Sequence, residues 1–264
     1  MGDREDEEVT RRLARRWPDG ASELDCVAVE EPLEIRVEGV PLAVVLRSPG
    51  HDLDLAAGFL FTEGVIDGPD DLVAIAHLSG DPARNTVDVR LAGGVTAHRD
   101  ALARATRELY ATSSCGVCGK ASIDRLEVLA TPRADWLAAD PALLVGLPAR
   151  LQALQPGFAA TGGLHGAALV GFDGAIDLAR EDVGRHNAVD KVLGARLRAD
   201  RVPVGDRVLV VSSRAGFEVV QKAAVAGIPL VAALGAPTSL AIDLAQRMRV
   251  TLVGFLREDR YNVY

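Results

Sequence analysis

The sequence predicts an α/β protein in two parts, a smaller α+β domain followed by a larger α/β domain. Strand-like and helix-like segments alternate from about residue 162 onward, which is typical of an α/β layer with a largely parallel sheet. Before that region, strand patterns with turn signals surround a single clear helix. Pro141 and Pro148 separate the two parts. At 264 residues the chain is long enough to bury a large core.

The first part follows a segment, residues 1–22, in which acids and arginines alternate; we expect a disordered tail there. The α+β domain is expected over residues 23–145. Its clearest helix should begin near Leu53, with Asp52 as its cap, and end at Gly64. The other predicted elements are strands at 26–29, 33–38, 42–46, 72–78 and 85–91, with a hairpin across 39–41, an irregular or weakly helical stretch at 99–109, and a helix at 122–129.

The α/β domain is expected over residues 146–264. A glycine-rich run leads into its first strand, and Asp173-Gly174 should turn the chain into a returning strand. The first helix carries an apolar face, which should pack on the sheet. The predicted strands are 162–170, 175–180, 207–213, 229–234 and 250–256, and the predicted helices are 185–198, 216–226 and 238–248.

Composition narrows the function. The net charge is -8, so general binding to nucleic acid is disfavoured, although a local basic pocket for a small anion is compatible with it. Three cysteines do not make a secreted disulfide framework, and a reducing cytoplasm is the simplest location. The N-terminus lacks the apolar run of a secretory signal, and no apolar stretch is long enough to cross a membrane.

Two cysteines form the most informative motif of the chain. Cys115 and Cys118 lie two residues apart in a stretch with Gly116 and Gly119, which predicts a loop. Lys120 follows and favours the thiolate, the reactive form of cysteine. The residues therefore indicate a pair of reactive thiols; a structural metal knuckle or two inert thiols are the alternatives.

Three polar stretches in the α/β domain lie where strands end or helices begin. Such positions suit ligands, because α/β sheets bind them outside their strand ends and free N–H groups there favour anions. The last stretch adds two guanidinium groups that suit phosphate. Helix capping, a satisfied histidine and a solvated charge run are the alternatives. The candidate residues are Arg185 and His186; Ser213 and Arg214; and Phe255, Leu256, Arg257, Glu258, Asp259 and Arg260.

Several motifs, in one order, resemble the FdhD family of formate dehydrogenase accessory sulfurtransferases. The cysteine loop Thr-Ser-Ser-Cys-Gly-Val-Cys-Gly-Lys at 112–120 and the run Glu-Asp-Val-Gly-Arg-His-Asn-Ala-Val-Asp-Lys at 181–191 are the most specific. The resemblance extends from about Glu23 to the end of the chain. It is also carried by Gly-Phe-Leu-Phe-Thr-Glu-Gly at 58–64, Gly-Gly-Leu-His-Gly-Ala-Ala at 162–168, Ser-Ser-Arg at 212–214 and Leu-Val-Gly-Phe-Leu-Arg at 252–257.

The resemblance implies a sulfur carrier that accepts sulfane sulfur from a cysteine desulfurase and delivers it to molybdenum. The acceptor would be the bis(molybdopterin guanine dinucleotide) cofactor of formate dehydrogenase, for which GDP is an analogue. The persulfide would form on Cys115, with Cys118 shielding, relaying or resolving it. Residues 255–260 would bind the cofactor, although Glu258 opposes phosphate unless it points away. A cytidine deaminase-like three-layer second domain and a homodimer are also implied.

Other functions remain to be weighed against this one. A cytidine deaminase-like hydrolase needs a His-x-Glu and a Pro-Cys-x-x-Cys, and the chain has neither. A zinc-binding module needs about four ligands, of which one Cys-x-x-Cys supplies two, so no metal ligand is assigned. A thiol–disulfide oxidoreductase would cycle a disulfide between the two thiols. A cofactor-binding chaperone without sulfur transfer is the remaining alternative.

Overall fold

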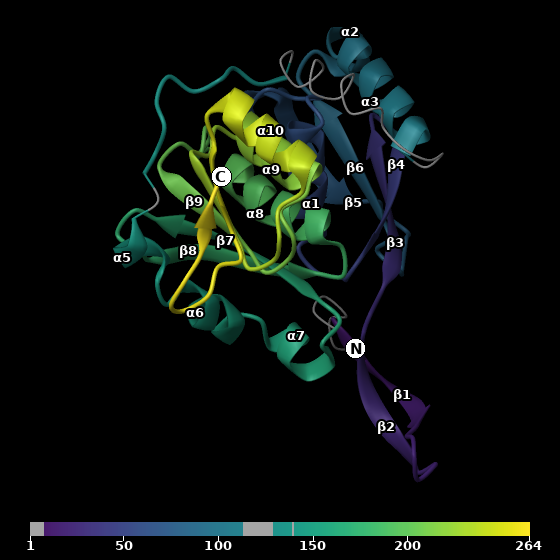
Figure 1. The fold of residues 1–264 in the computed structure, drawn as a ribbon. Helices are drawn as coiled ribbons and strands as arrows, with labels where there is room; N and C mark the ends of the chain where they lie inside the picture. The colour runs from purple at the N-terminus through teal and green to yellow at the C-terminus, as the bar shows by residue number, and fades with distance from the viewer. Residues whose placement is uncertain (1–7, 113–128, 139) are drawn as a thin grey trace.

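The structure is a computed structural model that describes residues 8–112, 129–138 and 140–264 (Figure 1). Within these ranges the strands form three sheets: a two-stranded hairpin, a four-stranded sheet and a six-stranded sheet. Cys115, Cys118 and most of the helix predicted at 122–129 lie outside the described residues. The protein is thus a mixed α/β structure with several sheets.

The N-terminal segment contains a β-hairpin, so the predicted tail is wrong over residues 9–15. Strand β1 (Val9–Arg15) pairs antiparallel with β2 (Ser22–Ala28), and Leu13 lies opposite Leu24. Most side chains of β1 are exposed to solvent. A strand in this position can therefore be rich in charged residues, which is why its sequence resembles that of a disordered tail. The hairpin extends away from the rest of the molecule (Figure 1).

The four-stranded sheet has the order β4-β3-β6-β5. The predicted hairpin is confirmed as β3 (Glu31–Val37) and β4 (Val40–Arg47), and the next two predicted strands as β5 (Leu72–His77) and β6 (Thr86–Leu91). Strand β3 also pairs parallel with β6. The helices of this part are α1 (Asp52–Thr62), the short 3-10 helix η2 (Pro69–Asp71), α2 (Gly94–Ala97) and α3 (Arg99–Thr112).

Three short helices join the two larger sheets: α5 (Pro141–Leu144), α6 (Leu147–Ala153) and α7 (Pro156–Thr161). Each of these helices has a proline at its first or second position. A backbone N–H at such a position has no acceptor within the helix, so a proline there costs no helical hydrogen bond. The prolines that we interpreted as breaks between domains therefore begin helices. The predicted boundary at residue 145 stays a prediction.

The six-stranded sheet has the order β12-β11-β10-β9-β7-β8, and it is mixed. Only β9–β10 and β10–β11 are parallel pairs, so the prediction of a largely parallel sheet is wrong. The tight turn after β7 returns the chain as an antiparallel neighbour, which a short connection permits. The strands are β7 (His165–Gly171), β8 (Ile176–Asp182), β9 (Arg207–Val211), β10 (Leu230–Ala233), β11 (Thr251–Gly254) and β12 (Asn262–Val263).

Helices cover both faces of this sheet. The predicted helices are confirmed as α8 (Arg185–Arg198), α9 (Phe217–Val225) and α10 (Ser239–Met248). Their apolar residues pack on one face, in a core that continues to the four-stranded sheet. The opposite face packs against leucines of α5 and α6. Alternate residues of β9 point to the two cores, as the pleat of a strand requires.

Helices α1 and α8 cross at two glycines, and this crossing packs the two halves of the protein against each other. A β-carbon on Gly58 would lie 2.0 Å from the carbonyl oxygen of Asp190, and one on Gly194 would lie 1.8 Å from that of Asp54. Only glycine permits backbones to approach this closely. Helix α8 begins three residues after the end of β8, and its first turn contacts the first turn of α9.

Candidate functional site

The predicted binding residues gather along one edge of the six-stranded sheet, which we call the carboxyl edge. Strands β9, β10 and β11 end there. Because β7 runs antiparallel to β9, it begins at the same edge, and β8 ends beside it, with His165 opposite Asp182. The three polar stretches, which are far apart in the sequence, therefore lie at one side of the sheet.

Backbone hydrogen bonds connect the loops of the carboxyl edge. The N–H of Gly166 donates to the hydroxyl of Ser212 at 2.9 Å, and the N–H of Gly235 donates to the carbonyl of Ser213 at 3.0 Å. The N–H of Phe255 donates in turn to the carbonyl of Gly235 at 3.0 Å. A β-carbon on Gly235 would lie 2.8 Å from the backbone of Arg214, so glycine is needed for this close packing.

The last predicted stretch, residues 255–260, forms a turn beside a hollow of about 290 Å³. The Nη1 of Arg257 donates to the carbonyl oxygens of Leu234 and Leu256, at 2.6 and 2.8 Å, which ties the turn to the end of β10. Phe255 is partly exposed and has a left-handed backbone with φ of 54°. Leu256 is fully buried in the core, so it supports the turn and does not face the hollow.

The acidic residue of this turn points away from its arginines. The carboxylate of Glu258 accepts a hydrogen bond from the N–H of Ala149 at 3.0 Å, in the first turn of α6. An acid at a helix N-terminus is favourable, because it meets the positive end of the helix dipole. Asp259 and Arg260 are both exposed and lie 4.0 Å apart. Glu258 therefore does not set its charge against an anion in the hollow.

The predicted residues Arg185 and His186 lie close to His165 and Glu218, which the sequence did not single out as site residues. The Nδ1 of His186 contacts the Oε2 of Glu218 at 2.5 Å, between the first turns of α8 and α9. The hydrogen bond from His186 lowers the pKa of Glu218, against the effect of its burial. Burial lowers the pKa of His165, and the nearby Arg185 and His186 lower it further.

His165, Arg185 and His186 therefore lie together with Glu218 at the carboxyl edge. His165 follows the glycine-rich run at 162–163, and Glu218 is an acid in the first turn of a helix; both signals are visible in the sequence but common. The predicted Ser213 is buried, its hydroxyl bonds the carbonyl of Arg214 at 3.0 Å, and Arg214 is exposed.

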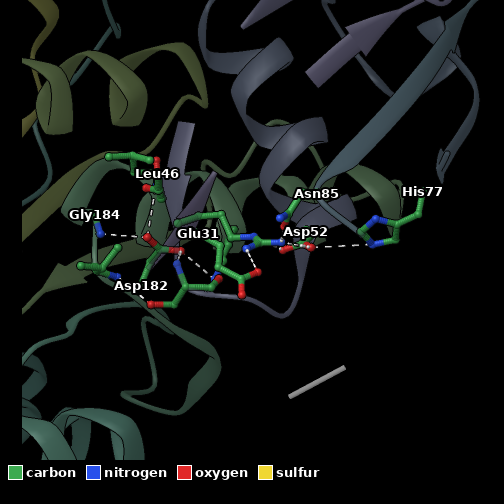
Figure 2. A network of polar contacts seen from close by, with 12 residues as sticks. Glu31, Leu46, Asp52, His77, Asn85, Asp182 and Gly184 are labelled. Atoms are coloured by element: carbon green, nitrogen blue, oxygen red, sulfur yellow. Dashed lines mark hydrogen bonds and ion pairs between the residues drawn. The ribbon is translucent and has the colours of Figure 1, made fainter. Parts of the chain in front are cut away.

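Several residues of the run at 181–191 make buried polar contacts between the two halves of the protein, and Figure 2 shows those around Asp182. Asp182 and Lys191 are completely buried, with 2.8 Å between the Oδ2 and the Nζ. The Nζ of Lys191 also donates to the carbonyl of Ser48 at 3.0 Å, and the N–H of Ser48 donates to Asp182 at 3.2 Å. Asn187 donates to Asp182 and to the carbonyl of Leu46.

These contacts join the end of β4 to the start of α8. Two more residues of the run are structural. Glu181 accepts hydrogen bonds from the N–H groups of Gly157 and Phe158 at the start of α7. Asp190 pairs with the buried Lys222 at 3.0 Å. Burial by itself lowers the pKa of Lys222, but the carboxylates of Asp190 and Glu63 outweigh it and raise that pKa.

A second part of the polar network lies in the first half of the protein (Figure 2). The guanidinium of Arg47 is buried and binds both carboxylate oxygens of Asp52, each at 3.0 Å. It also contacts Glu31 at 3.3 Å and Asn85 at 3.0 Å. The prediction that Asp52 caps α1 is wrong: His51 holds the cap position, and Asp52 forms this ion pair from the first helical turn.

Metal sites and membrane-spanning helices each have a structural requirement, with which the described residues can be compared. No group of three or more His, Cys, Asp or Glu side chains in the described ranges could hold a metal ion. No described helix is long and apolar enough to cross a membrane.

The fold and the carboxyl edge define an α/β protein in which arginine and histidine side chains gather at one edge of the six-stranded sheet. The model of the FdhD/NarQ family matches residues 28–264, and the chain belongs to this family. It is 47% identical over 250 residues to the sulfur carrier protein FdhD of Mycobacterium tuberculosis, covering 91% of this chain and 90% of the relative. Identity to the protein of the same name from Streptomyces coelicolor is 49% over 264 residues, covering 96% and 93%.

A solved structure shows the same arrangement. The crystal structure of a formate dehydrogenase accessory protein from Desulfotalea psychrophila matches with a TM-score of 0.74 at 26% identity. The match covers 97% of this chain and 95% of that one. The resemblance seen in the sequence is thereby confirmed at the level of the family.

Proposed function

We propose that this chain is a sulfur carrier that accepts sulfane sulfur from a cysteine desulfurase and delivers it to the molybdenum cofactor of formate dehydrogenase. The observation that supports the proposal best is the convergence of Arg185, His186, Arg214 and the turn at 255–260 on one sheet edge. The names of the relatives, sulfur carrier protein FdhD, agree with it. The two-thiol motif at 115 and 118 supplies the sulfur chemistry.

The carboxyl edge suits a dinucleotide cofactor that carries phosphates. Arg257 and Arg260 border the hollow beside Phe255 and Tyr261, so the guanine end would stack there while the guanidinium groups meet phosphate oxygens. Arg185 lies at the first position of α8, where backbone N–H groups add a partial positive charge. On this proposal the bis(molybdopterin guanine dinucleotide) is the substrate, and GDP imitates one of its ends.

The sulfur transfer consists of two exchanges. The thiolate of Cys115 attacks the outer sulfur of the donor's persulfide; a new S–S bond forms on Cys115, the donor's S–S bond breaks, and the donor cysteine leaves as a thiolate. Release of the carried sulfur as sulfide requires two electrons. The thiolate of Cys118 supplies them by attacking the Sγ of Cys115, which forms a disulfide and frees the outer sulfur.

The remaining parts of the proposal follow from the resemblance. The partners are a cysteine desulfurase and formate dehydrogenase, the protein acts in the cytoplasm as a homodimer, and it acts as a sulfurtransferase. The second half is proposed to have the cytidine deaminase-like three-layer arrangement, for which the helices on both faces of the six-stranded sheet are suitable.

The experiment is sulfur loading followed by intact-mass spectrometry. With a desulfurase and L-cysteine the protein should gain the mass of one sulfur, and reduction should remove it. Cys115→Ala should gain none. Cys26→Ala is the matched control, because Cys26 is a half-buried thiol of β2, and it should load normally. Full activation of formate dehydrogenase by Cys115→Ala would instead favour a cofactor-binding chaperone.

A second measurement separates sulfur loading from cofactor binding. GDP should bind the wild type, and Arg260→Ala should weaken it about tenfold or more, because a charge-assisted hydrogen bond is worth about 1.5–3 kcal/mol. Arg201→Ala removes an exposed arginine away from the carboxyl edge and should leave the affinity unchanged. Equal weakening in both variants would contradict the proposed position of the nucleotide.

A further inference from the structure

A cavity of about 620 Å³ lies far from the carboxyl edge. Its walls come from β1, the loop between β4 and α1, the loop between β5 and β6, and the end of α8. Helix α8 begins with Arg185 at the carboxyl edge and ends with Arg198 in the cavity wall. Fourteen helical residues span about 20 Å, so the two places are separate.

Positive charge exceeds negative charge in this cavity. Among the described residues its wall has four arginines and three carboxylates. The carboxylates are already neutralised within the protein. Asp52 and Glu31 both contact Arg47, while Asp54 contacts Arg198 at 2.5 Å and Arg180 at 3.3 Å.

Two arginines stand at the rim of the cavity. Arg12 is exposed on β1, and its Nη1 bonds the hydroxyl of Thr10 at 2.8 Å and the carbonyl of Arg11. No ion pair of Arg12 with a described residue is found. Arg84 lies in the loop between β5 and β6 on the other side. Burial lowers the pKa of His77, and the nearby Arg84 lowers it further.

The cavity wall also contains His77, at the end of β5. The side chain of His77 is 15% exposed, and its Nε2 lies 3.7 Å from Asp52. Burial lowers the pKa of His77, while Asp52 and a hydrogen bond with the backbone of Thr86 act in the opposite direction.

The start of α1 opens into the same cavity. His51, at the cap position, has a left-handed backbone with φ of 56° and makes no side-chain cap. Such a conformation is unfavourable in a residue other than glycine and is concentrated at functional sites. Without a side-chain cap, the first N–H groups of α1 remain suitable for an anion.

We propose that this cavity is a binding site for a small phosphate-type oligoanion, held between Arg12 and Arg84 over the start of α1. The guanidinium groups provide charge-assisted hydrogen bonds, and the helix amides add a favourable dipole. No Phe, Tyr or Trp of the described residues lines the cavity, so the phosphate groups and not a base are recognised. Because β1 forms one wall, the ligand would also attach the projecting hairpin to the body.

Pyrophosphate is the probe, titrated calorimetrically into the full chain without nucleotide, because the diphosphate of GDP would compete for the same cavity. The wild type should bind it saturably, and Arg12→Gln and Arg84→Gln should each weaken binding about tenfold, since one such hydrogen bond is worth at least about 1.4 kcal/mol. Both arginines are exposed, so neither change should impair folding.

The matched controls are Arg11→Gln and Arg90→Gln. Arg11 neighbours Arg12 on β1 but points to the opposite face of the strand, and Arg90 is exposed on β6. Both should bind pyrophosphate like the wild type. Absence of saturable binding to the wild type, or equal weakening in all four variants, would overturn the proposal. The variants also distinguish this site from the GDP site, because Arg260→Ala should leave pyrophosphate binding intact.

Discussion

Replacing Lys191 by Met tests whether the run at 181–191 is mainly structural. The substitution keeps a flexible chain of similar length but removes the ammonium. In the structure this ammonium is fully buried, and it contacts Asp182 at 2.8 Å, the carbonyl of Ser48 at 3.0 Å and that of Glu181 at 3.2 Å. All three of its protons are therefore used.

The expected loss of stability follows from what remains after the change. Removing one partner of a buried ion pair costs about 3–5 kcal/mol, because an uncompensated charge stays buried. Asp182 retains hydrogen bonds from the N–H groups of Ser48 and Gly184 and from Asn187, so we expect about 3 kcal/mol. In a chain of this size, that corresponds to a fall in Tm of about 6–12 °C.

Arg185→Met is the control, because it removes one positive charge from the same helix at a half-buried position. It should change the Tm by a few degrees at most and should weaken GDP binding. Differential scanning calorimetry gives the Tm of each variant. Adding Asp182→Asn to Lys191→Met removes the buried carboxylate charge that has lost its partner, and it should recover part of the lost stability. A Tm of Lys191→Met close to that of the wild type, or a larger fall for Arg185→Met, would refute this reasoning.

Two further predictions concern the helix crossing and pH. Gly194→Ala should destabilise the protein by about 1–3 kcal/mol, because the added carbon meets the carbonyl of Asp54; urea unfolding should show this loss and almost no change for Gly68→Ala, where the space is open. Burial lowers the pKa of His165 below its ordinary 6.5, so the unfolded chain binds the proton more readily, and stability should fall as the pH drops through about 6.5. Unfolding measured across this range should show a shallower fall for His165→Asn; an unchanged slope would contradict the assignment.

Periodicity allowed most elements of the second half to be predicted, but not how their strands pair. The helices at 185–198 and 238–248 follow from local patterns, which the structure confirms. The direction of β7 relative to β9 depends on tertiary pairing between segments about 40 residues apart, for which local sequence has no signal. Strand β1 was missed because its charged residues face solvent on a projecting hairpin, where binary patterning reports little burial.

The candidate site was predictable in part, because strand ends and helix starts are visible in the sequence. Arg185, His186 and Arg214 were found in this way. Glu218 was not, since an acid in the first turn of a helix usually needs no further explanation. Its contact with His186 arises only because α8 and α9 begin at the same sheet edge. Proximity of that kind belongs to the tertiary fold.

The run at 181–191 identifies the family, yet its residues divide into two roles. Asp182, Asp190 and Lys191 are buried, and their partners lie in both halves of the protein. Arg185 and His186 are the members that belong to the carboxyl edge. Most of the described contacts of this run are therefore buried contacts within the fold, and fewer of its residues lie at the carboxyl edge. Substitutions in the run should therefore be interpreted first by burial: loss of function at Lys191 indicates a damaged fold, and loss at Arg185 with an unchanged Tm indicates a damaged site.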